Sequence, residues 1–418
     1  MNYLGRFGLA AACILALAAF EQGNGVKAAG GPQEAVNQSY RVLAPIESGN
    51  LLLFPVVRAG SKSLGATPFL TLDEGIKSGE VEVTEAGRVQ GLVRPRGHVP
   101  PSNVAPIYHD DRFRGYPDPQ NEGVRGDEVN TLVLVNHSKQ PLLLLAGEIV
   151  TGGKQDRVIA KDRIVPAGAD PIDLGVFCIE PGRWTESSAT FGAAAKAPSH
   201  GFMVQPTIRE RAMVEKDQQQ VWDSVHGAIT QMYAAAPSAS TTSVGPSGGV
   251  MYDRAIGTTS YAKVMDNRAV SEKVDEAAAP VMKAQNEVLA QLREEHAVGV
   301  VVAVRGEIVW ADLFADTELL SRYWTKLVRS YAAESLTEGE SHKAPTQADA
   351  QHFLDAPAGG AESSEGEIGI YRYRELKTVH TETFVLESLL PGTGYDVHIS
   401  KMKLRAAEPR IKSPQIYY

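Results

Sequence analysis

The spacing of apolar residues predicts that the folded chain begins with β-strands. Residues 81–85 alternate between apolar and polar side chains, which is typical of a strand with one buried face. Residues 51–57 form an apolar run that contains Pro55, and we expect an edge strand there because proline has no N–H to donate to a neighbouring strand. Residues 131–135 and 142–145 also resemble strands, and the polar segment between them suits a hairpin connection.

One helix stands out in the second half of the chain. Between residues 317 and 335 apolar side chains recur at intervals of three and four residues, and Asp316 or Thr317 can cap the first turn. The buried stripe of this helix is largely aromatic, and core packing explains it better than a ligand-binding box does. The apolar positions of the stripe are Leu320, Tyr323, Trp324, Leu327, Val328 and Tyr331.

Further elements follow from the same kind of periodicity. They are helices at 208–234 and 270–296 and strands at 298–304, 307–310, 368–373 and 383–386. The first two of these strands are joined by Arg305-Gly306, which supplies a tight turn.

Together these patterns predict an α+β protein with a mainly antiparallel β core, sandwich- or barrel-like, and a few packed helices. Residues 40–400 show no second independent set of elements, so we expect a single domain. Low-complexity stretches at 236–260 and 337–365 predict exposed, mobile loops. Residues 401–418 form a locally basic tail, which is typical of a solvated chain end.

The N-terminal residues are typical of an export signal. Arg6 gives a small positive region, residues 8–20 form a short apolar stretch, and Val26-Lys27-Ala28 offers a cleavage site. An uncleaved membrane anchor is the alternative, although the apolar stretch is too short to span a bilayer. We therefore predict a signal peptide at residues 1–28 and a periplasmic or secreted protein with no stable membrane insertion after cleavage.

Composition and motif spacing exclude several classes of function. The chain has 418 residues, of which 43% are hydrophobic, and a formal net charge of −9. It can therefore bury a core, but it lacks the global basic character expected of a nucleic-acid-binding protein. The ten histidines show no zinc-type spacing, and no dinucleotide-binding glycine fingerprint follows a strand, so no metal and no cofactor are predicted. Only Cys178 remains after signal cleavage, which excludes an internal disulfide, and we expect it to be a buried packing residue.

Candidate chemistry is concentrated in residues 142–184. Glu148 follows a buried strand closely, and a carboxylate at that place must be solvated or paired, with Arg157 and Lys154 as the nearest candidate partners. Such a pair could be purely structural and close a hairpin. Alternatively, these side chains and Gln155 could form the floor of a polar pocket, where two neighbouring glycines let the backbone approach a ligand.

A second candidate group lies at the end of the strand-like run 176–179. Glu180 ends this run, and Arg183 and Trp184 follow a Pro-Gly turn with a planar cation and a large ring. This combination suits an anionic, sugar or nucleotide-like ligand. The alternative is a structural corner, in which Trp184 covers the core and Arg183 pairs with Glu180.

The same segment resembles a known domain family. The chain is similar to the ARG and rhodanese-phosphatase-superfamily-associated protein domain in the motifs Gly147-Glu148, Gly153-Lys154-Gln155, Arg157, Val165-Pro166-Ala167-Gly168 and Cys178-x-Glu180-x-Gly182-Arg183-Trp184. The strand at 298–304, Asp312-Leu313-Phe314 and the helix at 327–335 resemble the C-terminal half of that family. The resemblance implies a domain and a link to ADP-ribose-type ligands, without implying a particular reaction.

Three functions follow as hypotheses. The first is a non-catalytic binding domain for a small anionic, sugar or nucleotide-like ligand. The second is a hydrolase or transferase on a small glycosidic or ADP-ribose-like substrate with Glu148 and Glu180 as acid and base, which requires carboxylates roughly 5–9 Å apart. The third is an envelope scaffold that works through its surface. The candidate ligand-binding residues are Glu148, Lys154, Gln155, Arg157, Glu180, Arg183 and Trp184.

Overall fold

The fold is seen in a computed structural model of the chain. The residues that it describes are 40–58, 69–85, 131–182, 187–193, 201–236, 258–283, 294, 296–337, 339 and 341–404. The predicted signal peptide, residues 237–257 of the first predicted loop and the tail from residue 405 lie outside these described residues.

The largest sheet has nine strands, and all of its strand pairs are antiparallel. Its order in space is β1-β3-β13-β14-β18-β17-β16-β15, and β2 also pairs with β3. Strand β13 is buried along its whole length, which confirms the strand predicted at 298–304. The bounds are β1 Tyr40–Val42, β2 Ile46–Ser48, β3 Leu51–Arg58, β13 Ala297–Val304, β14 Glu307–Phe314, β15 Ala361–Glu367, β16 Tyr371–Lys377, β17 Thr381–Ser388 and β18 Asp396–Lys403.

A six-stranded antiparallel sheet closes almost into a barrel. Its order is β12-β8-β9-β11-β6-β5, and a bridge between Thr84 and Thr190 brings the two ends of that order together. A three-stranded sheet, β10-β7-β4, contributes to the same apolar interior and contains a parallel pair, β4 with β7. We call these two sheets the barrel region. Its strands are β4 Leu70–Thr71, β5 Val81–Glu85, β6 Thr131–Asn136, β7 Leu142–Leu144, β8 Ile149–Gly152, β9 Arg157–Ile159, β10 Arg163–Val165, β11 Ala169–Cys178 and β12 Phe191–Ala193.

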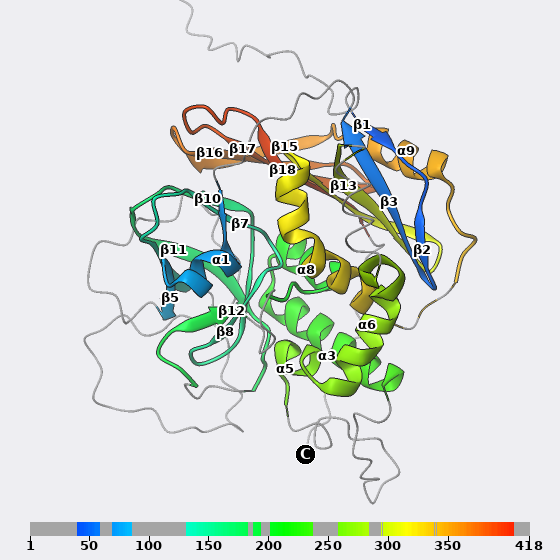
Figure 1. Cartoon of the computed structure of the whole chain (residues 1–418), viewed down its shortest axis with the longest axis horizontal. Coiled ribbons are helices and arrows are strands. Elements are labelled where there is room, and N and C mark those ends of the chain that lie inside the picture. The colour runs from blue at the N-terminus through cyan, green and yellow to red at the C-terminus, as the bar shows by residue number, and fades with distance from the viewer. Residues whose placement is uncertain are drawn as a thin grey trace, which may run out of the picture. The chain divides into compact units, whose positions relative to one another are not determined.

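Helices cover both faces of the nine-stranded sheet. The helix α8 packs on one face with α3, α5 and α6 gathered beside it, and α9 packs on the other face (Figure 1). In the described part of the chain, none of the helices combines the length and the apolarity that crossing a membrane requires. The helices are α1 Leu72–Ser78, α2 Pro206–Glu210, the π-helix η3 Arg211–Glu215, α3 Gln218–Ala235, α5 Tyr261–Met265, α6 Arg268–Lys283, α8 Thr317–Ser335 and α9 Gln347–Asp355.

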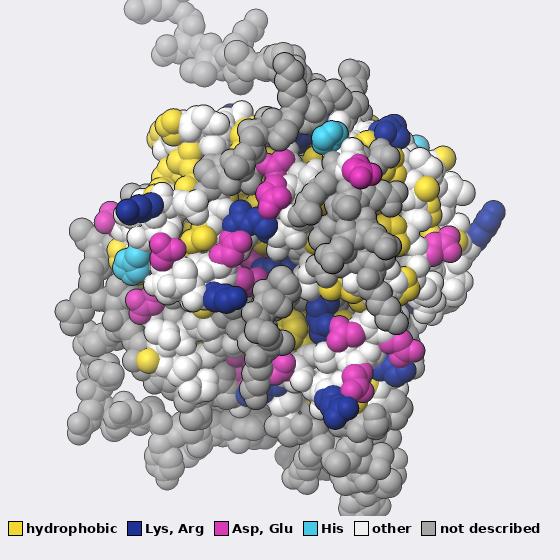
Figure 2. All heavy atoms as spheres, viewed as in Figure 1, with side chains coloured by type: hydrophobic (Ala, Val, Ile, Leu, Met, Phe, Trp, Pro, Cys, Tyr) yellow, Lys and Arg dark blue, Asp and Glu magenta, His cyan; other side chains and the backbone are white. Residues whose placement is uncertain are grey.

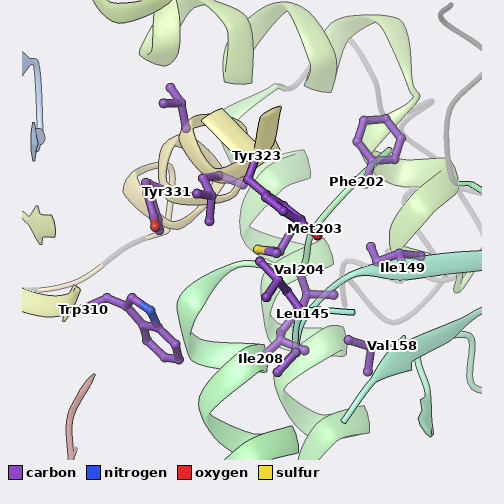
Figure 3. Close-up of a cluster of buried hydrophobic side chains, with 14 of the residues drawn as sticks. Leu145, Ile149, Val158, Phe202, Met203, Val204, Ile208, Trp310, Tyr323 and Tyr331 are labelled. Atoms are coloured by element: carbon purple, nitrogen blue, oxygen red, sulfur yellow. The ribbon is translucent and has the colours of Figure 1, made fainter. Parts of the chain in front are cut away.

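Helix α8 confirms the helix predicted at 317–335. The Asp316 side chain caps it by accepting a hydrogen bond from the backbone N–H of Leu319 at 2.8 Å. Its aromatic side chains are fully buried, so the stripe is core packing, as expected. Figure 3 shows Tyr323 and Tyr331 of this helix pointing into the same apolar cluster as Trp310 of β14 and Leu145 of the barrel region.

A buried chain of charged groups joins the barrel region to the nine-stranded sheet. Asp162, between β9 and β10, places Oδ2 2.6 Å from Nδ1 of His398 in β18. Nε2 of His398 lies 3.3 Å from Oδ1 of Asp312 in β14. Arg209 of α2 donates to both carboxylate oxygens of Asp312, at 2.8 and 3.1 Å. We call these four residues the buried charge network, and each of their side chains is 0% exposed.

Neighbouring groups complete this network. The hydroxyl groups of Tyr331 and Ser400 also donate to Asp312, so its carboxylate is fully hydrogen-bonded without water. Gly147, at a φ of 94°, lies so close to Arg209 that a Cβ atom there would stand 2.6 Å from Cγ of the arginine. Glycine at this position therefore allows the guanidinium to reach Asp312.

The prediction of an edge strand at 51–57 is wrong, because β3 lies inside the sheet between β1 and β13. Val56 pairs with Val42 in β1, and Leu53 pairs with Ile46 in β2. Pro55 therefore lies opposite the gap between β1 and β2. No neighbouring strand there needs a hydrogen bond from its nitrogen, which carries no hydrogen. Its carbonyl accepts from the backbone N–H of Leu43 at 2.7 Å. The missing N–H is tolerated by this local gap and not by an edge position.

The predicted hairpin between residues 131–135 and 142–145 is also wrong. Strand β6 pairs with β5 and β11, whereas β7 pairs with β4 and β10, so the connection crosses from one sheet to another. The amide of Asn136 stabilises this crossing by donating to the carbonyls of Gln140 and Pro166, each at 3.0 Å. A turn-like composition identifies a change of direction, but it does not select the strand that pairs next.

The predicted mobile loop at 337–365 contains helix α9 and strand β15 instead. Helix α9 begins with a capping box between Thr346 and Asp349, and only Ala350, Phe353 and Leu354 are buried. Three apolar positions in a nine-residue helix are too few to give a clear periodic pattern.

Strand β18 was not predicted, and it extends into the expected basic tail through Lys403. Its polar side chains are buried because they have internal partners. His398 contacts Asp162, and the ammonium group of Lys401 donates to the carbonyls of Leu354 and Ala356 at 3.2 and 2.6 Å. The predicted strand at 368–373 is also displaced, since Ile368 lies fully exposed in the turn before β16.

We expect the stability of the protein to fall as the pH rises from about 6.5 to about 9 on account of His398. Burial alone would lower the pKa of its imidazole, but the carboxylates of Asp162 and Asp312 outweigh burial and raise the pKa to about 9. Because this folded-state pKa lies above that of an unfolded histidine, the stabilisation is complete below about pH 6.5 and is lost as the pH rises through about 9. Urea denaturation measured across this range should show a loss on the order of 3 kcal/mol.

The variant His398→Gln supplies the control for this prediction. It cannot titrate in this range, so its lower stability should vary less with pH than that of the wild-type protein. Parallel losses of stability in both proteins would assign the titration to another group.

Candidate functional site

Glu148 lies in the bend between β7 and β8 and is 1% exposed. Its Oε2 accepts from the backbone N–H of Leu145 at 2.7 Å, and its Oε1 lies 2.6 Å from Nζ of Lys326 on α8. The partner of Glu148 is thus Lys326 and not Arg157 or Lys154, because α8 packs across this bend. Of the two interpretations of Glu148, this contact favours the structural one.

Lys326 connects Glu148 to a second carboxylate. The side chain of this lysine is 2% exposed, and its Nζ lies 2.5 Å from Oδ2 of Asp73 in α1. Burial alone would lower the pKa of Lys326, but Asp73 and Glu148 outweigh burial and raise it. Burial raises the pKa of Glu148, with the Lys326 ammonium acting against that rise. One cation therefore holds α1, α8 and the bend after β7 together.

The turn after β8 directs its backbone N–H groups at oxygen atoms of side chains. This turn, Gly152 to Asp156, approaches β5 and β11 closely, and Gly153 (φ 49°) has no room for a Cβ atom, which would stand 2.6 Å from Oε1 of Glu85. Such a concave set of N–H groups suits anions, and acidic side chains of the chain itself fill most of it. The contacts are Gly152 N to Asp156 Oδ1 at 3.1 Å, Gly153 N to Ser188 Oγ at 3.2 Å, Lys154 N to Glu85 Oε1 at 2.8 Å and Asp156 N to Glu180 Oε2 at 3.1 Å.

Glu180 lies at the end of β11 and is 2% exposed. Besides the N–H of Asp156, its carboxylate contacts Lys263 of α5, with Nζ 3.0 Å from Oε1. The side chain of Lys263 is 57% exposed, so this lysine is anchored by Glu180 and still accessible to solvent over much of its side chain. Ser260, which caps α5, donates to Asp156 and fixes the start of that helix against the turn.

Gln155 and Arg157 belong to the same group of residues as Glu180. Gln155 donates from Nε2 to the backbone carbonyl of Glu180 at 3.2 Å. Arg157 is 0% exposed, and its guanidinium donates to the carbonyl of Gln155 at 2.7 Å. The structure therefore brings the predicted residues Gln155, Arg157 and Glu180 together, and it adds Asp156 and Lys263.

Glu148 and Glu180 are held on opposite sides of β9. The carbonyl of Glu148 accepts from Ile159, whereas the carboxylate of Glu180 accepts from Asp156. Their backbones are thus roughly 10 Å apart along the strand and about 10 Å apart across it. Each carboxylate has its own lysine partner, so the contacts do not pair the two carboxylates with each other.

The other predicted residues can be placed in part. Arg183 and Trp184 lie outside the described residues. Cys178 is fully buried at the end of β11, and burial raises the pKa of its thiol, which confirms it as a packing residue. Within the ranges that the structure describes, His, Cys, Asp and Glu side chains form no group of three that could hold a metal ion.

The sequence analysis did not single out Lys326 and Lys263, which pair with the two glutamates. Lys326 carried a signal, because it follows Tyr323 by three residues and lies next to Leu327 on the apolar stripe of the helix. A charge beside a buried stripe requires a partner. Lys263 carried no such signal, since it comes from a short helix far along the chain from Glu180.

We expect Lys326→Met to destabilise the protein by about 3–5 kcal/mol, because it leaves the carboxylate of Glu148 buried without a counter-ion. The double variant Glu148→Gln, Lys326→Met should recover a large part of this loss, since the uncompensated charge is gone. The exposed lysine of the Lys273–Glu276 pair gives the control, and Lys273→Met should change the free energy of unfolding by at most about 1 kcal/mol. Chemical denaturation measures all three, and similar losses for Lys326→Met and Lys273→Met would contradict a buried structural role.

Comparison with known proteins agrees with the motif resemblance. The ARG and Rhodanese-Phosphatase-superfamily-associated Protein domain matches residues 39–402, which is nearly the whole chain. The chain gives no significant match to a curated protein or to a solved structure. The matched residues include the barrel region, the group around Glu180 and every helix and strand described above except the last residue of β18. The chain therefore belongs to the ARG and Rhodanese-Phosphatase-superfamily-associated Protein domain family.

Proposed function

We propose that the protein is a non-catalytic binding domain for a small anionic, sugar or nucleotide-like ligand. The site that we propose is the turn from Gly152 to Arg157 with Glu180 and Lys263 at its edge. The observation that carries this proposal is the ion pair in which buried Glu180 holds Lys263, whose side chain is still 57% exposed. A cation that is oriented before binding loses less conformational freedom when a ligand arrives.

The distribution of charge on the protein supports recognition of a ligand by individual side chains. On the face shown in Figure 2, basic and acidic side chains are interspersed. The formal net charge of the chain is −9, so its overall field does not attract anions. A ligand with a negative or polar group must therefore be recognised locally, and Lys263 offers such a local contact.

We include Arg183 and Trp184 in the proposal because of their position in the sequence. They follow Glu180 by three and four residues, so Arg183 can lie at most about 11 Å from it along the backbone. A guanidinium and an indole near Glu180 would add a bidentate grip and a stacking surface. Sugar rings and nucleotide-like groups combine the features that these side chains recognise.

The carboxylate contacts favour binding over the alternative of a hydrolase or transferase. Glu148 is bound to Lys326 and to a backbone N–H, and Glu180 is bound to Lys263 and to a backbone N–H. Both carboxylates are thus engaged by groups of the protein itself. A scaffold function would need an extended apolar surface, and only Ile368 and Val379 stand out as exposed large apolar side chains among the described residues.

The proposal predicts binding that depends on Lys263. In thermal-shift and calorimetric titrations with ADP-ribose, AMP and sugar phosphates, we expect at least one to bind the wild-type protein. Lys263→Gln keeps a donor for Glu180 but removes the charge, and it should weaken that binding by about tenfold or more. Lys273→Met, which alters another lysine outside the proposed site, is the matched control and should bind normally.

Two results would contradict this proposal. One is wild-type affinity in both Lys263→Gln and Arg183→Ala. The other is turnover of a bound glycoside or ADP-ribose derivative that Glu148→Gln or Glu180→Gln abolishes, because such a result would support the hydrolase instead.

We also propose that the protein is exported, on the basis of Arg6, the apolar residues 8–20 and the small residues around Ala28. In cells expressing the full chain, fractionation should recover a product outside the cytoplasm, and its N-terminus should lie after Ala28 when determined by mass spectrometry. Replacing two leucines of the apolar stretch, Leu15→Arg and Leu17→Arg, should keep the full-length chain in the cytoplasm. An intact N-terminus in the wild-type product together with a cytoplasmic location would contradict export.

A further inference from the structure

The two outer edges of the nine-stranded sheet differ. The β1 edge is closed by side chains of α9. Gln351 accepts from the N–H of Val42 at 2.8 Å and donates to the carbonyl of Tyr40 at 3.1 Å, and Gln347 donates to the carbonyl of Val42 at 2.7 Å. These amides make the hydrogen bonds that a further strand would make, so this edge is blocked.

At the opposite edge, β15 pairs with β16 without a register shift, and no other described strand pairs with its outer side. Its seven residues pair with β16 from Ala361↔Lys377 to Glu367↔Tyr371, and β15 is the last strand in the order of the sheet. Residues 361–364 are exposed. The strand Ala-Glu-Ser-Ser-Glu-Gly-Glu contains neither proline nor lysine, which are the residues that most often protect an edge.

Basic residues of the barrel region neutralise two of the three glutamates in β15. Glu365 lies 2.6 Å from the ammonium of Lys161, and Glu367 pairs with the guanidinium of Arg163. The edge therefore carries less charge than its sequence suggests. Glu362 is the remaining acidic residue of the strand.

The order of residues in β15 allows the strand to pair with β15 of a second copy of the chain. An antiparallel pair centred on Ser364 would place Glu362 opposite Gly366 of the partner subunit. Glu365 would then face Ser363 of the partner subunit, and Glu367 would face Ala361 of the partner subunit. No two glutamates oppose each other in this register, and each glutamate faces a small residue.

We infer that two copies of the chain associate through β15, with a twofold axis at Ser364, and join their nine-stranded sheets into one continuous antiparallel sheet. Such an isologous contact satisfies the outer hydrogen-bonding groups of both edges at once. The interface is narrow, so the dimer should dissociate on dilution. The inference does not depend on the proposed ligand site.

Sedimentation over a concentration series tests this dimer in the full exported chain. As the protein concentration increases, the mass of the wild-type protein should rise from that of one chain towards that of two chains. Ser364→Lys would place two ammonium groups against each other at the axis, and it should raise the dissociation constant by at least about tenfold. Val379→Lys adds the same charge at an 86% exposed position in the turn between β16 and β17, and it should leave association unchanged.

Cysteine cross-linking tests the register. Residues that face each other across an antiparallel pair have Cα atoms about 4.5–5.5 Å apart, which is within the range of a disulfide. In a Cys13→Ser background, mild oxidation should therefore link Ser364→Cys into a dimer but leave Val379→Cys unlinked, and Cys178 is buried and cannot compete. A wild-type mass of one chain at every concentration, equal effects of the two lysine variants, or equal cross-linking at the two positions would each overturn the inference.

Discussion

The structure depends most on the balance of charge in the buried charge network of Asp162, His398, Asp312 and Arg209. Two carboxylates and two cations lie together without exposure to solvent, so the desolvation of each charge is offset mainly by the opposite charges beside it. The four residues come from the barrel region, from two strands of the large sheet and from α2. The network is therefore complete only when these parts have assembled. This requirement ties the position of the barrel region to that of the sheet more specifically than apolar contact alone can do.

The same physical rule operates at the two glutamates that the sequence analysis singled out. Glu148 and Glu180 are both buried, both accept a backbone N–H, and both pair with a lysine from a helix. They differ in the exposure of that lysine, which is 2% for Lys326 and 57% for Lys263. A sealed ion pair can only stabilise the fold, whereas an anchored and exposed cation can also contact a ligand. This difference is why the proposed binding site is centred on Glu180 and Lys263.

Errors in predicting the fold have identifiable physical causes. Pro55 indicated an edge strand, but the gap between β1 and β2 removes the need for its N–H. Residues 136–141 had the composition of a hairpin, yet the amide of Asn136 holds a crossing between two sheets. Strand β18 was missed because His398, Ser400 and Lys401 are polar, and their burial depends on partners far away in the chain. In each case the deciding contact joins segments that local patterns treat separately.

The sequence by itself determined the α+β class, the long capped helix α8, the buried strand β13, the packing role of Cys178 and the family. These features follow from periodicity, capping and motifs, which are properties of neighbouring residues. Only the tertiary structure decided that Lys326 neutralises Glu148, that Lys263 neutralises Glu180, and that the two glutamates lie apart on either side of β9. The physical reason is that a buried charge is stabilised by whichever opposite charge the fold brings to it, and the spacing of residues along the chain does not specify that partner.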